Sequence, residues 1–68
     1  MKVRYDKKVD AAYIQWSSDK PDGAVEIAEG VILHTTARNE LVAIEILDAG
    51  KKFPIKTLYK LELSPFAA

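Results

Sequence analysis

The sequence predicts an α+β fold, an antiparallel β-meander of about five strands followed by one short C-terminal helix. Three observations support this class. Apolar and polar residues alternate with a period of two through most of the chain up to residue 47, as in strands with one buried face. Clusters of turn-forming residues separate the alternating runs. After Pro54 the apolar spacing changes to the i, i+3, i+4 spacing of a helix.

The chain begins with an expected β-hairpin. Charged and apolar residues alternate in residues 2–5, and residues 6–10 interrupt the alternation with charge and turn formers. Residues 11–16 then alternate again. This pattern indicates two strands joined by a loop of about five residues.

Residues 17–23 form the clearest loop, because Ser, Asp, Pro and Gly each favour turns. A short third strand is expected at residues 25–27, and Glu29 and Gly30 indicate a tight turn after it. The β-branched stretch 31–36 predicts a fourth strand.

The fifth strand, residues 41–47, is the most apolar of the series. Residues 37–40 form the turn before it, and Asn39 is the residue there that most readily adopts a positive φ. Residues 48–52 end the meander, and Pro54 suits the first turn of a helix, where its missing N–H costs nothing.

The predicted helix runs from about residue 54 to residue 60. It places three apolar residues on one side: Ile55, Leu58 and Tyr59. Alternation through Leu61 and Leu63 favours a final extended piece. We therefore expect a single small domain over residues 1–68, with the meander in 1–50, the helix and extended segment in 51–64 and a tail in 65–68.

The alternation assigns most apolar residues to one face of the sheet, and we expect the C-terminal helix to cover them as one continuous core. These residues are Val3, Tyr5, Ala12, Ile14, Trp16, Val25, Ile27, Val31, Leu33, Val42, Ile44 and Ile46. The opposite face is mixed, and an apolar minority on it would be left exposed in a monomer. We therefore predict an interface there, formed by Tyr13, Ile32, His34, Leu41 and Leu47.

Composition excludes several classes of chemistry. The absence of cysteine rules out a disulfide scaffold, a thiolate zinc site and a cysteine nucleophile, and one histidine cannot form a His–His metal pair. No nucleophile–base or metal constellation can be assembled from the sequence, so we expect a protein that is not an enzyme and has no cofactor. Asp6 and Asp10 bracket the first turn, where carboxylates suit Ca²⁺ or Mg²⁺, but bonding to turn amides is the simpler expectation. For His34, pairing across strands with Glu45 or Arg4 is simpler than catalysis.

The charge balance argues against two kinds of partner. Ten Lys and Arg residues cancel ten Asp and Glu residues, so no strong field favours nucleic acid or an anionic membrane. No run approaches the length of a membrane span, and the charged N-terminal residues do not resemble a signal peptide, which predicts a cytoplasmic protein. Weak or regulatory nucleic-acid binding through the lysines is the alternative function that we keep.

Several segments of the chain resemble a known family. They are residues 1–6 (MKVRYD), 10–14 (DAAYI), 29–33 (EGVIL) and 42–49 (VAIEILDA). Together they cover roughly residues 1 to 50 and resemble the short prokaryotic proteins grouped as domain of unknown function 2283. The resemblance implies a small β-meander with a C-terminal helix and no established activity. Genes of some members lie beside small toxin-like genes. This chain departs from the family where members commonly have Asp, Tyr, Asp in place of His34, Thr35 and Thr36.

The sequence therefore predicts a non-enzymatic interaction module. A chain of 68 residues has a marginal core, and domains of this size without disulfide or metal often rely on association. We expect self-association, with a dimer favoured, and pairing with a small toxin-like protein as a further role.

Overall fold

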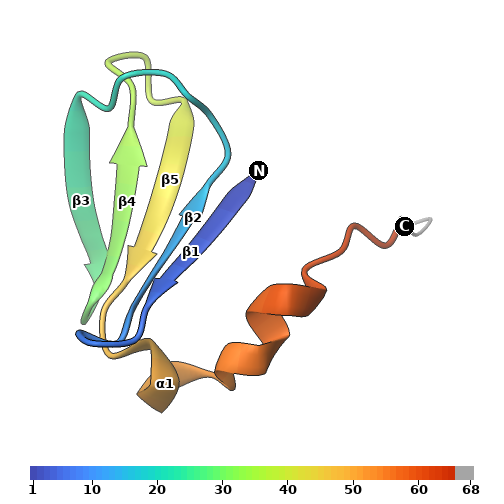
Figure 1. The fold of residues 1–68 in the computed structure, drawn as a ribbon. Coiled ribbons are helices and arrows are strands. Elements are labelled where there is room, and N and C mark those ends of the chain that lie inside the picture. The colour runs from blue at the N-terminus through green and yellow to red at the C-terminus, as the bar shows by residue number, and fades with distance from the viewer. Residues whose placement is uncertain (66–68) are drawn as a thin grey trace.

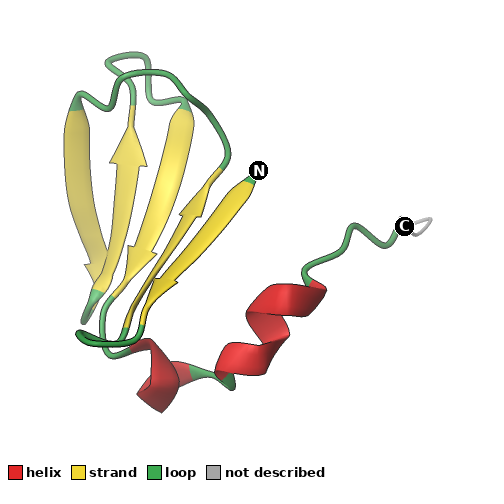
Figure 2. Cartoon of the chain, viewed as in Figure 1, coloured by secondary structure: helices red, strands yellow, loops and turns green. Residues whose placement is uncertain are grey.

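The computed structural model describes residues 1–65 and shows one five-stranded antiparallel sheet followed by two short helical segments (Figures 1 and 2). The strands are β1 (Lys2–Asp6), β2 (Ala11–Gln15), β3 (Gly23–Ala28), β4 (Val31–Thr35) and β5 (Leu41–Ile46), and the helices are α1 (Ala49–Lys52) and the 3₁₀ helix η1 (Ile55–Lys60). The predicted α+β class and all five predicted strands are confirmed. The helix expected at about residues 54–60 is present as η1, a 3₁₀ helix, and α1 is an additional short helix that the sequence did not indicate.

The order of the strands in the sheet is β1-β2-β5-β4-β3. Strands β3, β4 and β5 form a meander, but the expectation that the whole sheet follows chain order is wrong, because β2 pairs with β5 and not with β3. The loop after β2 crosses the end of the sheet to its far edge (Figure 1), which gives strands β2 to β5 a Greek-key order. This order places the apolar β5 in the centre and leaves β3 at an edge.

Left-handed backbone occurs in two turns: it was expected at Asn39, whereas for Gly30 the sequence predicted only a tight turn. Asn39 in the β4–β5 turn has a φ of 63°, and Gly30 in the β3–β4 turn has a φ of 71°. Asp10 and Asp48 also have positive φ, at 54° and 51°, which the sequence did not indicate.

The strand register confirms the division of the sheet into an apolar and a mixed face. Val3 lies opposite Ile14, Ile14 opposite Ile44, and Leu33 opposite both Ile44 and Val25, so these side chains share a face. The register shifts between Glu26 and Ala28 in β3, and between the pairs formed by His34 and Thr35 with β5. Such β-bulges change which face the residues beyond them occupy.

The expected continuous core is wrong. Of the apolar residues predicted to form it, only Ala12 and Val42 are buried, while Trp16 is 46% exposed, Val25 58% and Ile27 56%. The reason is the position of the C-terminal segment. It extends beside β1, at one edge of the sheet (Figure 1), and does not lie across the centre.

We call residues 53–65 the C-terminal arm. It borders the sheet on the β1–β2 side, where a cavity of about 180 Å³ lies between Val3, Tyr5 and the apolar residues of η1. Ile55 and Leu58 are half-buried there, but Tyr59 is 89% exposed, so the expected contribution of Tyr59 to the core is also wrong. Residues 61–65 continue without regular secondary structure.

Candidate functional site

The mixed face of the sheet carries a row of polar and aromatic side chains. The guanidinium carbon of Arg4 lies 5.0 Å from the centre of the Tyr13 ring, and the Tyr13 and His34 rings are 5.9 Å apart at an angle of 54°. His34 Nε2 lies 3.2 Å from Glu45 Oε1. Ala43 lies opposite both His34 and Gln15 and is fully buried. The row therefore consists of a cation–π contact, a pair of tilted rings and one cross-strand polar pair.

This arrangement confirms the simpler expectation for His34. Its side chain is 21% exposed and that of Glu45 is 35% exposed, which places the pair at a partly solvated surface. The pair is diagonal, since the residue directly opposite Glu45 on β4 is Ile32. A hydrogen bond between these two side chains joins the central strand to β4.

The structure brings together three of the five residues predicted to form an interface. Tyr13 and Ile32 both lie opposite Glu45, and His34 lies opposite Ala43, so these three share the mixed face. All three are half-buried. Leu47, which is 39% exposed, follows β5 and donates its backbone N–H to the carbonyl oxygen of Gly30.

The face expected for Leu41 is wrong. Thr35, two residues beyond Leu33, belongs to the apolar face, and Leu41 lies directly opposite Thr35. The bulge at Val42 causes this, because one extra residue in β5 shifts the alternation that the sequence suggested. Leu41 is 40% exposed and therefore adds to the apolar face.

The apolar face exposes more large apolar side chains than the mixed face does. Its most exposed large side chains are Trp16 at one end of β2 and Val25 and Ile27 on β3. Val3, Ile14, Leu33 and Ile44 on the same face are half-buried. The arm leaves the β3 side of this face uncovered.

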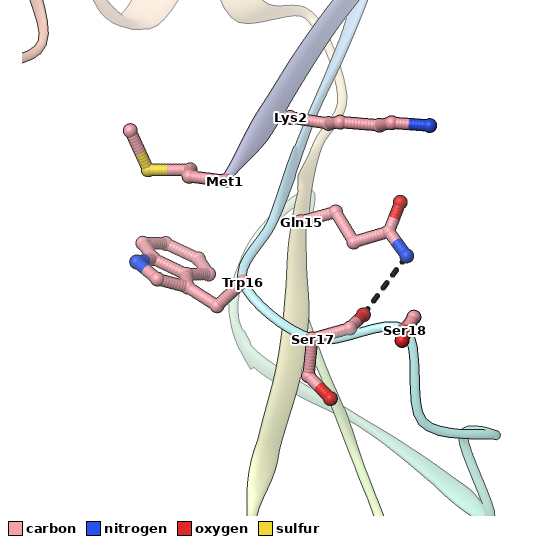
Figure 3. Close-up of a pocket in the computed structure, with 6 residues that line it drawn as sticks. All are labelled: Met1, Lys2, Gln15, Trp16, Ser17 and Ser18. Atoms are coloured by element: carbon pink, nitrogen blue, oxygen red, sulfur yellow. Dashed lines mark hydrogen bonds between the residues drawn. The ribbon is translucent and has the colours of Figure 1, made fainter.

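At the open end of the β1–β2 hairpin, side chains project toward both faces of the sheet. Figure 3 shows Met1 and Trp16 projecting to one side of the hairpin, and Lys2 and Gln15 to the other. Gln15 Nε2 donates a hydrogen bond of 2.8 Å to the carbonyl oxygen of Ser17. These residues line a cavity of about 190 Å³, whose lining contains no carboxylate or imidazole. Since the lining side chains project to both sides of the hairpin, they do not converge on one ligand atom.

Asp10 connects two distant turns. Its Oδ1 accepts a hydrogen bond of 2.7 Å from the Tyr5 hydroxyl and one of 2.9 Å from the backbone N–H of Gly50. Its backbone carbonyl accepts a bond of 2.9 Å from the N–H of Ala49. Asp6 behaves as expected and accepts a bond from the Lys8 amide within its own turn, whereas Asp10 bonds the amide of another turn.

These contacts shift two pKa values in opposite directions. The hydrogen bond from Tyr5, followed by the one from the Gly50 amide, lowers the pKa of Asp10, with a smaller contribution from the positive charges of Lys51 and Lys52. The same bond to Asp10 raises the pKa of Tyr5, and burial and the nearby carboxylates raise it further. Both shifts describe a carboxylate that is held as a hydrogen-bond acceptor.

Within residues 1–65, no three His, Asp or Glu side chains gather in a group that could hold a metal ion. In the same residues no helix combines the length and the apolar character needed to cross a bilayer.

The comparison with protein families agrees with the geometry of the sheet. Residues 2–49 match the model of a protein of unknown function, DUF2283. The matched segment begins with β1 and ends at Ala49, the first residue of α1, so it contains the whole sheet and the Tyr5–Asp10 contact but not the arm. No curated protein and no solved structure matches the chain. Because the match covers well over half of the sequence, the chain belongs to the DUF2283 family.

Proposed function

We propose that this protein is a non-enzymatic interaction module that self-associates through the apolar face of its sheet. The observation that supports this function is the exposure of that face. Val25 and Ile27 are both more than half exposed, and the arm does not reach them. Exposed apolar area of this kind is typical of surfaces that bind another protein.

The accessible surface of the chain supports the same proposal. The chain exposes 5597 Å², whereas a compact monomer of 7.6 kDa is expected to expose about 4,300 Å². Its radius of gyration is 12.9 Å, against about 11 Å for a compact domain of this length. The excess area, roughly 1,300 Å², exceeds the ~800 Å² per partner that a standard interface buries. A dimer therefore has enough surface available.

Two substitutions on β3 test which face associates. Val25 lies on the apolar face, opposite Leu33, and its neighbour Ala24 lies on the mixed face, opposite His34. Both are exposed. We expect Val25→Glu to be monomeric at concentrations where the native protein is a dimer, and Ala24→Glu to remain a dimer, both measured by analytical ultracentrifugation.

The reverse result, dissociation by Ala24→Glu alone, would support the interface predicted around Tyr13, Ile32 and His34 and contradict the proposal. Circular dichroism on both variants establishes that each one is folded. If Val25→Glu unfolds, Val25→Ser removes the apolar contact without introducing a charge and is measured instead. A native protein that stays monomeric at millimolar concentration would show that self-association is wrong.

A further inference from the structure

The C-terminal arm presents apolar side chains that its own chain leaves exposed. Ile55, Leu58 and Tyr59 line the cavity beside Val3 and Tyr5. Tyr59 nevertheless remains 89% exposed, and Leu63 is 94% exposed. A second cavity, of about 290 Å³, is lined by Leu61 and Leu63 of the arm and by Ile14 and Trp16 of the sheet. The arm therefore borders the β1 and β2 side of the sheet, but its own chain leaves most of the surface of Tyr59 and Leu63 exposed.

Strand β3 presents the complementary feature. It is an edge strand, and all six of its residues are exposed. Val25 and Ile27 are the most exposed large apolar residues of the five strands. The other edge, β1, has Lys2, Arg4 and Asp6 alternating along it, and charged side chains of this kind discourage association at a sheet edge.

The arm cannot cover β3 of its own chain. It lies beside β1, and the order β1-β2-β5-β4-β3 puts four strand spacings between β1 and β3. At about 4.8 Å per spacing, the two edges are about 19 Å apart. A second molecule related by a two-fold axis parallel to the strands, with the apolar faces turned toward each other, has its β1 edge above the β3 edge of the first.

We propose that in the self-associated protein the arm of each copy lies between its own β1–β2 surface and strand β3 of the other copy. The inference rests on the proposed function and specifies the partner surface. Tyr59 and Leu63 of one copy then cover Val25 and Ile27 of the other. The contact occurs twice, as a two-fold symmetric interface requires.

Charge along the two surfaces favours this pairing. The region around β3, residues 17–30, contains four acidic residues, Asp19, Asp22, Glu26 and Glu29, and one basic residue, Lys20. Glu26 lies on the mixed face, opposite Ile32, so the other three acidic residues carry this argument. The arm carries Lys56 and Lys60 with one acid, Glu62. Both lysines are exposed. Opposite charge at the rim of an interface increases the rate of association and fixes its orientation.

A second copy is the partner that these observations favour. Both halves of the contact, the exposed arm and the exposed edge strand, occur in the same chain. The formal net charge of the chain is zero, so two copies have no net repulsion to overcome. The available surface is sufficient for a dimer interface.

A charge exchange between two variants tests the proposal on the full chain. The arm variant carries Lys56→Glu and Lys60→Glu, and the strand variant carries Asp22→Lys and Glu29→Lys. All four residues are exposed. In a homodimer of either variant, each of the two arm–β3 contacts brings like charges together, so we expect at least tenfold weaker dimerisation. In an equimolar mixture both contacts of the heterodimer join opposite charges, so we expect heterodimers of near-native affinity.

Two further variants make the experiment specific. Lys2→Glu with Arg38→Glu changes the net charge as the arm variant does, but alters β1 and the β4–β5 turn, and we expect native dimerisation. Tyr59→Ser with Leu63→Ser removes the apolar side chains of the arm, and we expect weaker dimerisation at any salt concentration. Raising the salt concentration should weaken the native dimer and reduce the difference between the charge variants.

The outcomes separate this inference from the proposed function. Native-like dimers in both charge variants and in the Tyr59 and Leu63 variant would show that the arm does not contact β3, while self-association stands. Failure of the mixed variants to form a heterodimer would also contradict the arm–β3 contact. A native protein that is monomeric at millimolar concentration would contradict both proposals.

Discussion

At the scale of single residues, the carboxylate of Asp10 joins turns that are 40 residues apart in sequence, through the bond from the Gly50 amide. Asp10 also has a positive φ of 54°, a conformation that Asn and Asp tolerate better than Ala. We therefore expect Asp10→Ala to lower the melting temperature markedly, because it removes both side-chain bonds and places Ala in the left-handed region. Asp10→Asn keeps an acceptor oxygen and tolerates this backbone, and its melting temperature should fall less. Equal melting temperatures for the two variants would contradict this role.

The pKa shifts at this contact predict how stability depends on pH. The folded state lowers the pKa of Asp10 below its ordinary 3.8, so its contribution to stability is full above that value and is lost as pH falls through the lower folded pKa. The folded state raises the pKa of Tyr5 above 10.0, so its contribution is full below 10.0 and is lost as pH rises through the higher folded pKa.

Urea denaturation at a series of pH values measures both effects. We expect the native protein to lose stability below about pH 4 and above about pH 10, and Tyr5→Phe to lose the tyrosine-dependent part of the alkaline change. In Asp10→Asn, the loss of stability at acid pH should be smaller than in the native protein. A Tyr5→Phe protein with an unchanged alkaline profile would indicate that other groups control it.

At the scale of elements, alternation identified all five strands, because side chains of a half-buried strand differ on its two faces. It could not identify which strands are neighbours. If β2 formed a hairpin with β3, each of its side chains would point to the same face as it does when β2 pairs with β5. The alternation of apolar and polar residues therefore does not distinguish the two pairings. The β-bulge at Val42 could not be predicted from the sequence either, because no Gly or Pro marks it. This bulge places Leu41 on the apolar face.

The turn between β3 and β4 provides a test of one element. Gly30 has a φ of 71°, and a Cβ built there would lie 3.3 Å from the Leu47 carbonyl oxygen. We expect Gly30→Ala to destabilise the protein by about 1–2 kcal/mol, the usual cost of left-handed backbone for a residue with a Cβ. Gly23 is the matched control, because a Cβ there meets its nearest atom, Thr35 Oγ1, at 3.9 Å. Gly23→Ala should therefore be neutral or slightly stabilising in the same urea titration, since Gly within a strand is unfavourable.

At the scale of the whole molecule, the sequence predicted a C-terminal helix in contact with the sheet, but not the part of the sheet that the helix contacts. Helical spacing at Ile55 and Leu58 correctly indicated a contact with the sheet, and those residues do face Val3 and Tyr5. The spacing carries no information on which strand the helix would contact. Because the arm lies beside an edge strand, it leaves the β3 side of the apolar face exposed, and we therefore propose the interface on this face and not on the mixed face.

Association of this kind makes folding depend on concentration. If two copies cover each other's apolar faces, dimerisation stabilises the folded state by mass action, and unfolding becomes harder as the protein is concentrated. For a domain of this length we expect the melting temperature to rise by about 5 °C for each tenfold increase in protein concentration. Val25→Glu, which places a charge in the proposed interface, should show a lower melting temperature that is independent of concentration. Calorimetry over a hundredfold range of concentration measures both slopes. A native melting temperature that does not change over that range would mean that the apolar face remains exposed to water in the folded protein, and that the sheet is stable without a second copy.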